Sequence, residues 1–201
     1  MKSLAILSLV LLFISACSIR PEAKPPITQY FLQPEISLTC LPSPSQKVIR
    51  LNFASTGSFL STQNITYTKS DLIAGTYLYS KWSQRVDHSI STALYTALKD
   101  NKVFSRLVYE NTLIQSDLIL ELKVLRFEHH FTDTEHSKAV IILDATIYDS
   151  KTHELLSNHL FKADVKAETN DAKGAVNALN TALESLLTEL ICWSVQQKSL
   201  S

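Results

Sequence analysis

The feature that most constrains the fold is a run of apolar side chains at every second position near the middle of the chain. The run comprises Ala139, Ile141, Leu143, Ala145 and Ile147. Successive side chains of a β-strand point to opposite faces, so residues at every second position share one face. The pattern therefore predicts a strand whose one face is buried against the interior of the protein.

The segment 117–131 predicts a second long strand. Its apolar residues change face partway along: Leu118 to Val124 alternate on one face, whereas Leu125 and Phe127 fall on the other. A β-bulge inserts one extra residue into a strand and shifts the side chains that follow it. We therefore expect a bulge near Leu125 that brings Leu125 and Phe127 into register. The polar segments "TDTEHS" and "DSKTHE" are typical of hairpin connections between long strands.

Two segments show the three- and four-residue spacing of amphipathic helices. The first carries Trp82, Val86, Ile90, Ala93 and Ala97, and Asp100 and Asn101 suit its end. The second begins near Asp171 and carries Val176, Leu179, Leu183, Leu186, Leu190 and Trp193. The stripe of the second helix could pair with a partner helix in a coiled coil. Because the same chain contains a sheet that needs covering, we favour packing inside the domain.

Shorter strand-like segments surround these elements. They read "TQYFLQPE", "QKVIRLNFA", "NITYT" (as an edge strand), "GTYLYSKW", "FSRLVYE" and "LLSNHLFKADVKA". The order is strands, helix, strands, helix, and two amphipathic helices can bury their stripes on one face of a sheet. The sequence predicts a single α+β domain, an antiparallel sheet with two amphipathic helices packed on one face.

The amino terminus has the pattern of a secretory signal peptide. Lys2 precedes a short apolar run that ends in small residues, and this run is shorter than the roughly 20 residues that span a bilayer. The run ends in Ile14-Ser15-Ala16-Cys17, which resembles the bacterial lipobox. This resemblance implies that residues 1–16 are removed and that Cys17 is acylated. The alternative is cleavage after Ala16 that leaves a free thiol. By the same resemblance, Ser18 in place of Asp favours the outer membrane.

All six prolines of the chain lie in the first 44 residues. Proline fixes the backbone in extended conformations, so proline-rich segments act as stiff spacers. We therefore interpret residues 17–27 as a lipidated, proline-rich tether and residues 28–198 as the domain. At about 3.3 Å per residue, the tether could hold the domain up to roughly 30 Å from a lipid surface.

Two further cysteines, Cys40 and Cys192, remain once Cys17 is assigned to the lipid. In an oxidising, exported compartment an even number of cysteines favours a disulfide. The alternative is two separate buried thiols, because cysteine is among the residues most often buried.

The sequence contains no motif that indicates chemistry. Its 19 basic and 19 acidic residues are mixed along the chain, which argues against nucleic acid as a partner. Phosphate-binding glycine loops, nucleophile elbows and zinc-protease motifs are absent, so we expect no catalytic residues and no cofactor. The cluster "FEHHFTDTEH" contains His129, His130 and His136 and could bind a metal. Strand alternation would send His129 and His130 to opposite faces, and we favour a polar hairpin without metal.

Several segments together resemble the ABC-type transport auxiliary lipoproteins, the PqiC-like family. They are the lipobox, "TQYFLQP", the tyrosine-rich run into a Trp-headed helix (Tyr77, Tyr79 and Trp82), "SDLILELKVLRFEHHF" and the last helix. The resemblance covers roughly residues 27–195. The chain departs from the family in "FASTGSFL", which lacks the usual proline.

This resemblance implies a non-enzymatic α+β lipoprotein of an MCE-type ABC lipid transport system. Its partners would be an MCE-domain protein, ABC transporter subunits and, through the lipid anchor, the outer membrane from its periplasmic side. Phospholipid is a further candidate ligand. Two alternatives remain open: a periplasmic carrier that binds lipid itself, and a structural envelope lipoprotein without a transporter partner.

Overall fold

The computed structural model describes residues 23–40, 45–54, 57, 59–69, 72–109 and 112–196. Cys17, the predicted signal peptide and the first part of the predicted tether lie outside the described residues. In chain order, the elements are β1 (Thr28–Tyr30), β2 (Ser45–Ala54), β3 (Asn64–Lys69), β4 (Ile73–Trp82), α2 (Val86–Asp100), β5 (Phe104–Tyr109), β6 (Leu118–Phe131), β7 (Ser137–Asp149), β8 (Leu155–Lys166) and α3 (Ala172–Gln196).

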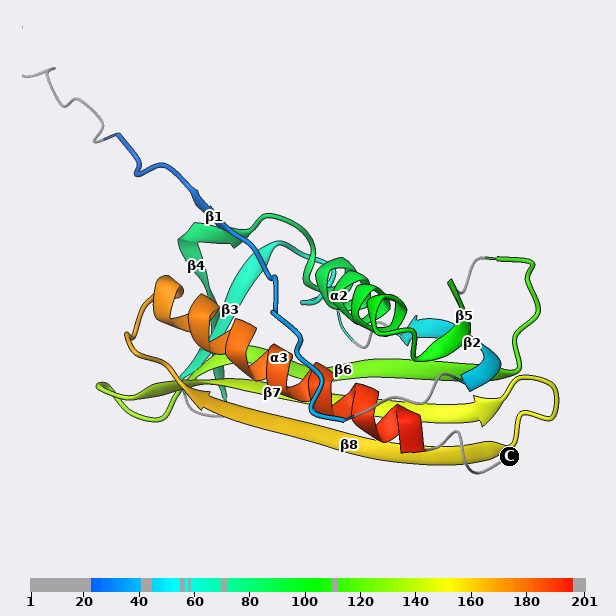
Figure 1. The fold of residues 1–201 in the computed structure, drawn as a ribbon. Coiled ribbons are helices and arrows are strands. Elements are labelled where there is room, and N and C mark those ends of the chain that lie inside the picture. The colour runs from blue at the N-terminus through cyan, green and yellow to red at the C-terminus, as the bar shows by residue number, and fades with distance from the viewer. Residues whose placement is uncertain are drawn as a thin grey trace, which may run out of the picture.

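The strands form one sheet built around β6. On one side of β6 lies β7, and β8 lies beyond β7. Strand β7 forms an antiparallel hairpin with β6, and β8 forms one with β7. Along the other side, β2 pairs with the first half of β6 and β3 pairs with its last three residues. Strand β5 extends the sheet beyond β2, while β4 and β1 extend it beyond β3. The sheet is therefore long, with the β2–β5 group at one end and the β1–β4–β3 group at the other (Figure 1).

The predicted α+β class is confirmed, but the sheet is mixed rather than wholly antiparallel. Strands β2 and β3 run parallel to β6, β5 runs parallel to β2, and β1 runs parallel to β4. The segment "NITYT" forms β3, which lies between β4 and β6 and so is not the edge strand that we predicted. Parallel neighbours need long crossover connections, and side-chain periodicity carries no information about strand direction.

The predicted bulge in β6 is present at Leu125. Val124 pairs with Leu143 and Arg126 pairs with Ile142, so Leu125 is the extra residue. The shift brings Phe127 onto the buried face, where it is 3% exposed. Leu125 itself does not join that face and remains 44% exposed, which corrects our expectation for this residue.

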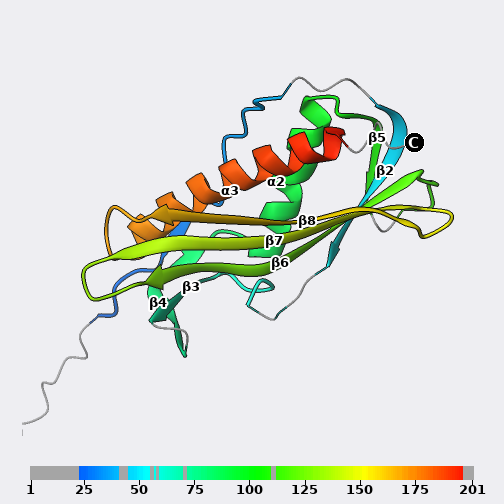
Figure 2. The ribbon, with the colours of Figure 1, turned by 90° about the horizontal axis from the view of Figure 1, so that it is seen from below.

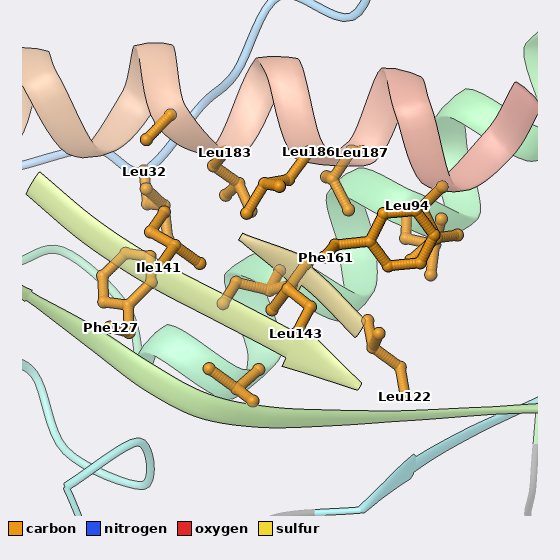
Figure 3. Close-up of a cluster of buried hydrophobic side chains, with 14 of the residues drawn as sticks. Leu32, Leu94, Leu122, Phe127, Ile141, Leu143, Phe161, Leu183, Leu186 and Leu187 are labelled. Atoms are coloured by element: carbon orange, nitrogen blue, oxygen red, sulfur yellow. The ribbon is translucent and has the colours of Figure 1, made fainter. Parts of the chain in front are cut away.

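Both helices cover the same face of the sheet (Figure 2). Helix α3 lies over β6, β7 and β8, while α2 lies over β2 and β5. Their apolar stripes belong to one core, which includes Leu94 of α2, Phe161 of β8 and Leu187 of α3 (Figure 3). The stripe of α3 is buried within the domain, which confirms core packing in place of a coiled coil. Trp82 at the end of β4 is also a buried core residue.

Helix α3 begins at a tight turn that requires glycine. The Asp171 carboxylate accepts hydrogen bonds from the Gly174 backbone N–H (2.8 Å) and the Thr169 hydroxyl (2.7 Å), which satisfies a free donor of the first turn. A Cβ on Gly174 would lie 2.1 Å from the carbonyl oxygen of Thr169. The chain entering α3 therefore passes too close to the helix for any side chain at this position.

We predict that Gly174→Ala destabilises the domain, although alanine is the better helix former. The clash with a backbone carbonyl requires a shift of the turn, and overpacking of this kind costs about 1–3 kcal/mol. Urea denaturation measures the change in the free energy of unfolding. Asn177→Ala, at an exposed position of the same helix, is the matched control and should change stability by less than about 0.5 kcal/mol. Equal stability of the two variants would contradict the prediction.

Candidate functional site

The chain that leaves β1 is tied down along α3. Residues 31–40, here called the strap, run beside α3 after β1 (Figure 1). The Asn180 side chain of α3 holds the strap backbone: its Oδ1 accepts the Gln33 N–H (2.7 Å), and its Nδ2 donates to the Phe31 carbonyl (3.3 Å). Leu32, between these two residues, is buried in the core. The strap is thus part of the folded domain rather than of the tether.

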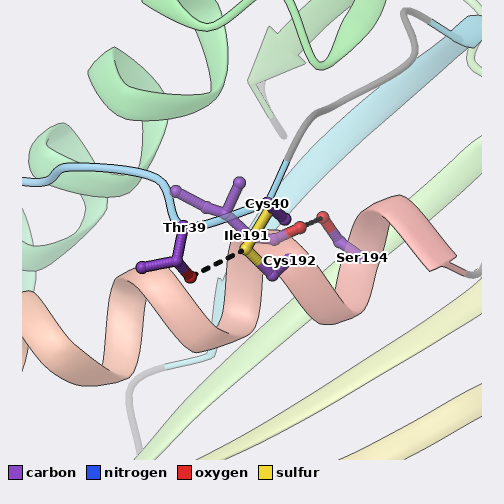
Figure 4. The surroundings of a disulfide bond; sticks show 5 residues. All are labelled: Thr39, Cys40, Ile191, Cys192 and Ser194. Carbon is purple, nitrogen blue, oxygen red and sulfur yellow. Dashed lines mark hydrogen bonds between the residues drawn. A yellow bond between two sulfur atoms is a disulfide. The ribbon is translucent and has the colours of Figure 1, made fainter.

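The far end of the strap is joined to the last helix by a disulfide. Cys40 and Cys192 are bonded with a Cα–Cα distance of 5.7 Å (Figure 4). The Thr39 hydroxyl lies 3.9 Å from Cys192 Sγ. The strap is therefore held at three points, namely the pairing of β1 with β4, the Asn180 side chain and the disulfide. A force applied to the amino-terminal chain would therefore act on the sheet through β1 and on α3 through Asn180 and the disulfide.

A groove of about 520 Å³ lies between the strap and α2. Phe31 and Ile36 line it from the strap, while α2 contributes small side chains such as Ser89, Thr92 and Thr96. Asp100 is the one charged residue in this lining. The groove therefore offers shape and hydrogen-bonding groups rather than a paired acid and base.

A more apolar pocket of about 380 Å³ lies between α2 and strands β2 and β6. Its apolar lining consists of Leu51, Phe53, Leu94, Tyr109, Leu120 and Leu122. His88, Ser91 and Asn52 complete the lining. Pockets that bind small molecules have this size and combine a mostly apolar wall with a few polar groups. Chemically, the pocket could accept a hydrocarbon chain.

The three histidines of the predicted cluster are separated in the structure. His129 is fully buried on the helix-covered face of β6, and its Nδ1 lies 2.7 Å from the Tyr77 hydroxyl. His130 lies on the opposite face and bonds Thr68, and His136 bonds Asp133 in the β6–β7 hairpin. Among the residues that the structure describes, no three histidine, cysteine or acidic side chains are grouped as metal ligands would be.

Burial perturbs the titration of both His129 and its partner Tyr77. Burial lowers the pKa of His129 to about 4, with the nearby Asp171 carboxylate opposing the shift and His130 adding to it. Its Nε2 atom has no hydrogen-bond partner within the described part of the chain. Burial, with Asp171 and Tyr67 nearby, also raises the pKa of Tyr77. The Tyr77–His129 pair is therefore neutral at pH 7.

We predict that the domain loses stability in acid through His129. The unfolded histidine binds a proton below pH 6.5, whereas the folded one remains neutral down to about pH 4. The contribution of neutral His129 to the free energy of unfolding is therefore fully present above pH 6.5 and is lost as the pH falls from 6.5 to 4. Between pH 7.5 and pH 5 the free energy of unfolding should fall by roughly 2 kcal/mol. Denaturation at several pH values measures this slope. His129→Gln can still bond Tyr77 but does not titrate, and its slope should be flatter over the same range; an unchanged slope would refute the assignment.

Sequence reasoning missed two features of this region. The buried His129 could have been found, because it follows Phe127 on the same face once the bulge is placed. The contact of Asn180 had a weaker signal. Asparagine has a low helix propensity, so its position inside a helix hints at a specific role for its side chain. The partner of Asn180 lies 147 residues away in the sequence, which no local pattern reveals.

Among the described residues, no helix is both long and apolar enough to cross a bilayer. Solved structures show that the fold has been seen before. A Xanthomonas campestris protein of the family designated DUF330 aligns with a TM-score of 0.77 and 19% identity, over 87% of this chain and 100% of that one. A second structure, of an uncharacterised protein, aligns with a TM-score of 0.62 and 14% identity, over 85% and 99% of the two chains. No functionally curated protein matches the sequence.

The family comparison defines the class as lipoproteins of the cell envelope. More particularly, the model of the family "ABC-type transport auxiliary lipoprotein component" matches residues 30–190. The chain belongs to this family. Its membership confirms the predicted resemblance and associates the protein with an ABC transport system. The family is an auxiliary component of transport rather than an enzyme family.

Proposed function

We propose that the protein is anchored by acylated Cys17 to the periplasmic side of the outer membrane, where it docks an MCE-type ABC lipid transport system. The observation that carries the proposal is the family match over most of the chain. In this proposal residues 1–16 are the signal peptide, residues 17–27 the tether and residues 28–198 the domain. The strap supports the proposal, because it joins the tethered chain rigidly to the body that would bear the partner.

The docking surface that we propose lies at the end of the sheet away from β1. Tyr109, the last residue of β5, together with Leu113 and Ile114 in the segment that leads to β6, is here called the distal tip. Leu113 is fully exposed, and Ile114 and Tyr109 are 51% and 40% exposed. Exposed apolar side chains that gather on one surface mark interaction sites. This end of the domain lies opposite the end at which the amino-terminal chain leaves, and in our proposal the partner binds here (Figure 1).

Purification of the full chain in mild detergent from the native host tests the proposal. We expect MCE-domain and ABC transporter subunits in the eluate, and we expect their loss from a Leu113→Ser/Ile114→Ser variant. Leu160→Ser, an exposed leucine on β8, is the matched control and should retain them. If no such subunit co-purifies and deletion of the gene leaves outer-membrane lipid asymmetry and detergent resistance unchanged, the transport assignment is wrong.

A second candidate function, direct lipid carriage, is favoured by the apolar pocket between α2, β2 and β6. In that case lipid should be released when the purified domain is denatured. Leu94→Trp would fill the pocket from α2 and should reduce the amount of lipid released. Absence of lipid from the native protein would leave docking as the function.

A further inference from the structure

Strand β4 exposes an unusual concentration of large apolar side chains. Leu72, just before the strand, is 94% exposed, Ile73 is 60% exposed and Leu78 is 72% exposed. Tyr79 is also partly exposed. Beyond β4 the sheet continues only through the three residues of β1, which pair with Ser80 to Trp82. Within the described chain, no strand covers the outer edge of β4 before Ser80.

A large bulge in β4 explains why Leu78 and Tyr79 point outwards. Asn64 of β3 pairs with Lys81, and Thr66 pairs with Thr76, so two steps along β3 correspond to five steps along β4. The extra residues form a corner between Tyr77 and Trp82, whose side chains both contact the core. Bulges redirect side chains in this way. The corner therefore presents Leu78 and Tyr79 to the surroundings as a consequence of the fold.

The chain enters the domain at this corner. Thr28 pairs with Ser80, so Ile27, which is half exposed, lies beside Tyr79. The amino-terminal chain leaves the domain at this end, and the β5–β6 loop lies at the other (Figures 1 and 2). Ile27 lies ten positions after Cys17 in the sequence, and an extended chain of that length reaches at most about 35 Å. A lipid on Cys17 therefore holds this end of the domain close to the bilayer.

The charges carried by the entering segment, β3 and β4 favour the same contact. Lys24, Lys69 and Lys81 lie in the entering segment, in β3 and in β4, and the described residues of these three segments include no acidic side chain. Glu22 and Asp71 adjoin them but lie outside the described residues. Lysines at the rim of an apolar patch are attracted to anionic lipid headgroups, and tyrosine favours the interface between headgroups and acyl chains.

We propose that the domain rests on the bilayer that holds its anchor through an anchor-end patch of Ile27, Leu72, Ile73, Leu78 and Tyr79. This inference rests on the lipidation of Cys17 in the proposed function and adds an orientation to it. The apolar side chains of the patch enter the headgroup region, and the lysines contact the phosphates. The distal tip then points away from the membrane. The lipid and the patch together fix the direction in which the domain projects.

Site-specific fluorescence tests this orientation in the full-length, processed protein. Leu78→Cys introduces one free thiol, since Cys17 carries the lipid and Cys40 is bonded to Cys192. The labelled protein is reconstituted into phosphatidylethanolamine–phosphatidylglycerol vesicles that contain a headgroup-quencher lipid. Leu113→Cys in the distal tip is the matched control, being another largely exposed leucine at the other end of the domain. Leu72→Cys replaces Leu78→Cys if circular dichroism shows that the latter does not fold.

We expect several-fold stronger quenching at position 78 than at position 113. Equal quenching at the two positions, or stronger quenching at 113, overturns the orientation. Cross-linking between Leu78→Cys copies without quenching assigns the patch to a second copy and also overturns it. Mass spectrometry of the amino-terminal peptide separates the two proposals: acylated Cys17 with no quenching refutes the orientation alone, whereas unmodified Cys17 refutes the anchor and the orientation together.

Discussion

Replacing Cys17 by Ser is expected to abolish lipid attachment and, with it, the stable membrane association of the processed protein. Two or three acyl chains anchor a protein almost permanently, because each buried methylene contributes about 0.8 kcal/mol. A serine hydroxyl cannot form the thioether, so this whole contribution is lost. Mass spectrometry of the amino-terminal peptide and fractionation of the envelope measure the two effects.

The control for this experiment is the Cys40→Ser/Cys192→Ser variant, which keeps Cys17 and should still be acylated. It shows that the loss is specific to the thiol that follows Ala16. An unmodified amino terminus at Cys17 in the wild-type protein from its native host would contradict the prediction.

Removal of the disulfide is expected to have the largest effect on stability. Cys40 and Cys192 are separated by 152 residues, so their bond closes a loop that includes nearly the whole domain. In the loop-entropy model a loop of this length stabilises the folded state by about 4–5 kcal/mol, and measured values are typically 2–4 kcal/mol. The Cys40→Ser/Cys192→Ser variant should therefore show a lower free energy of unfolding by about 2–5 kcal/mol.

Urea denaturation with and without reductant provides the measurement. Reductant should destabilise the wild-type protein and leave the double variant unchanged, which separates the disulfide from other effects of the reductant. Non-reducing peptide mapping should recover the Cys40 and Cys192 peptides joined together. If both thiols are alkylated in denatured protein that was never reduced, the bond does not form in the cell envelope and the prediction is wrong.

The three attachments of the strap give the disulfide a role beyond stability. β1 and Asn180 hold the strap near the tether, and the disulfide holds its other end on α3. A force on the proposed lipid anchor would thus be shared between the sheet and the helix. In the proposed function the partner pulls on the body of the domain while the anchor holds the amino-terminal chain. The strap and its disulfide would then carry this force between the two.

Local patterns in the sequence determined the type of nearly every element in the described chain. The stripe on α3, the alternation along β7 and the bulge at Leu125 each follow from side-chain spacing over a few residues. Such spacing reports which face an element buries, because the period of a helix or a strand is set by its own backbone. The lipobox-like sequence that ends at Cys17 and the lack of a recognisable catalytic motif are also read from the sequence alone, and acylation of Cys17 stays a prediction.

Only the tertiary structure decided how these elements meet. The parallel pairing of β2 and β3 with β6 and the contact of Asn180 with the strap join residues far apart in the chain. The corner at Leu78 depends on an irregular register between the neighbouring strands β3 and β4. Each depends on which of several compatible strand orders buries the most apolar surface, and a single sequence does not rank those orders. Leu125 shows the limit within one strand: the pattern required an extra residue there, but the packing of β7 against β6 determined that Leu125 itself would face the solvent.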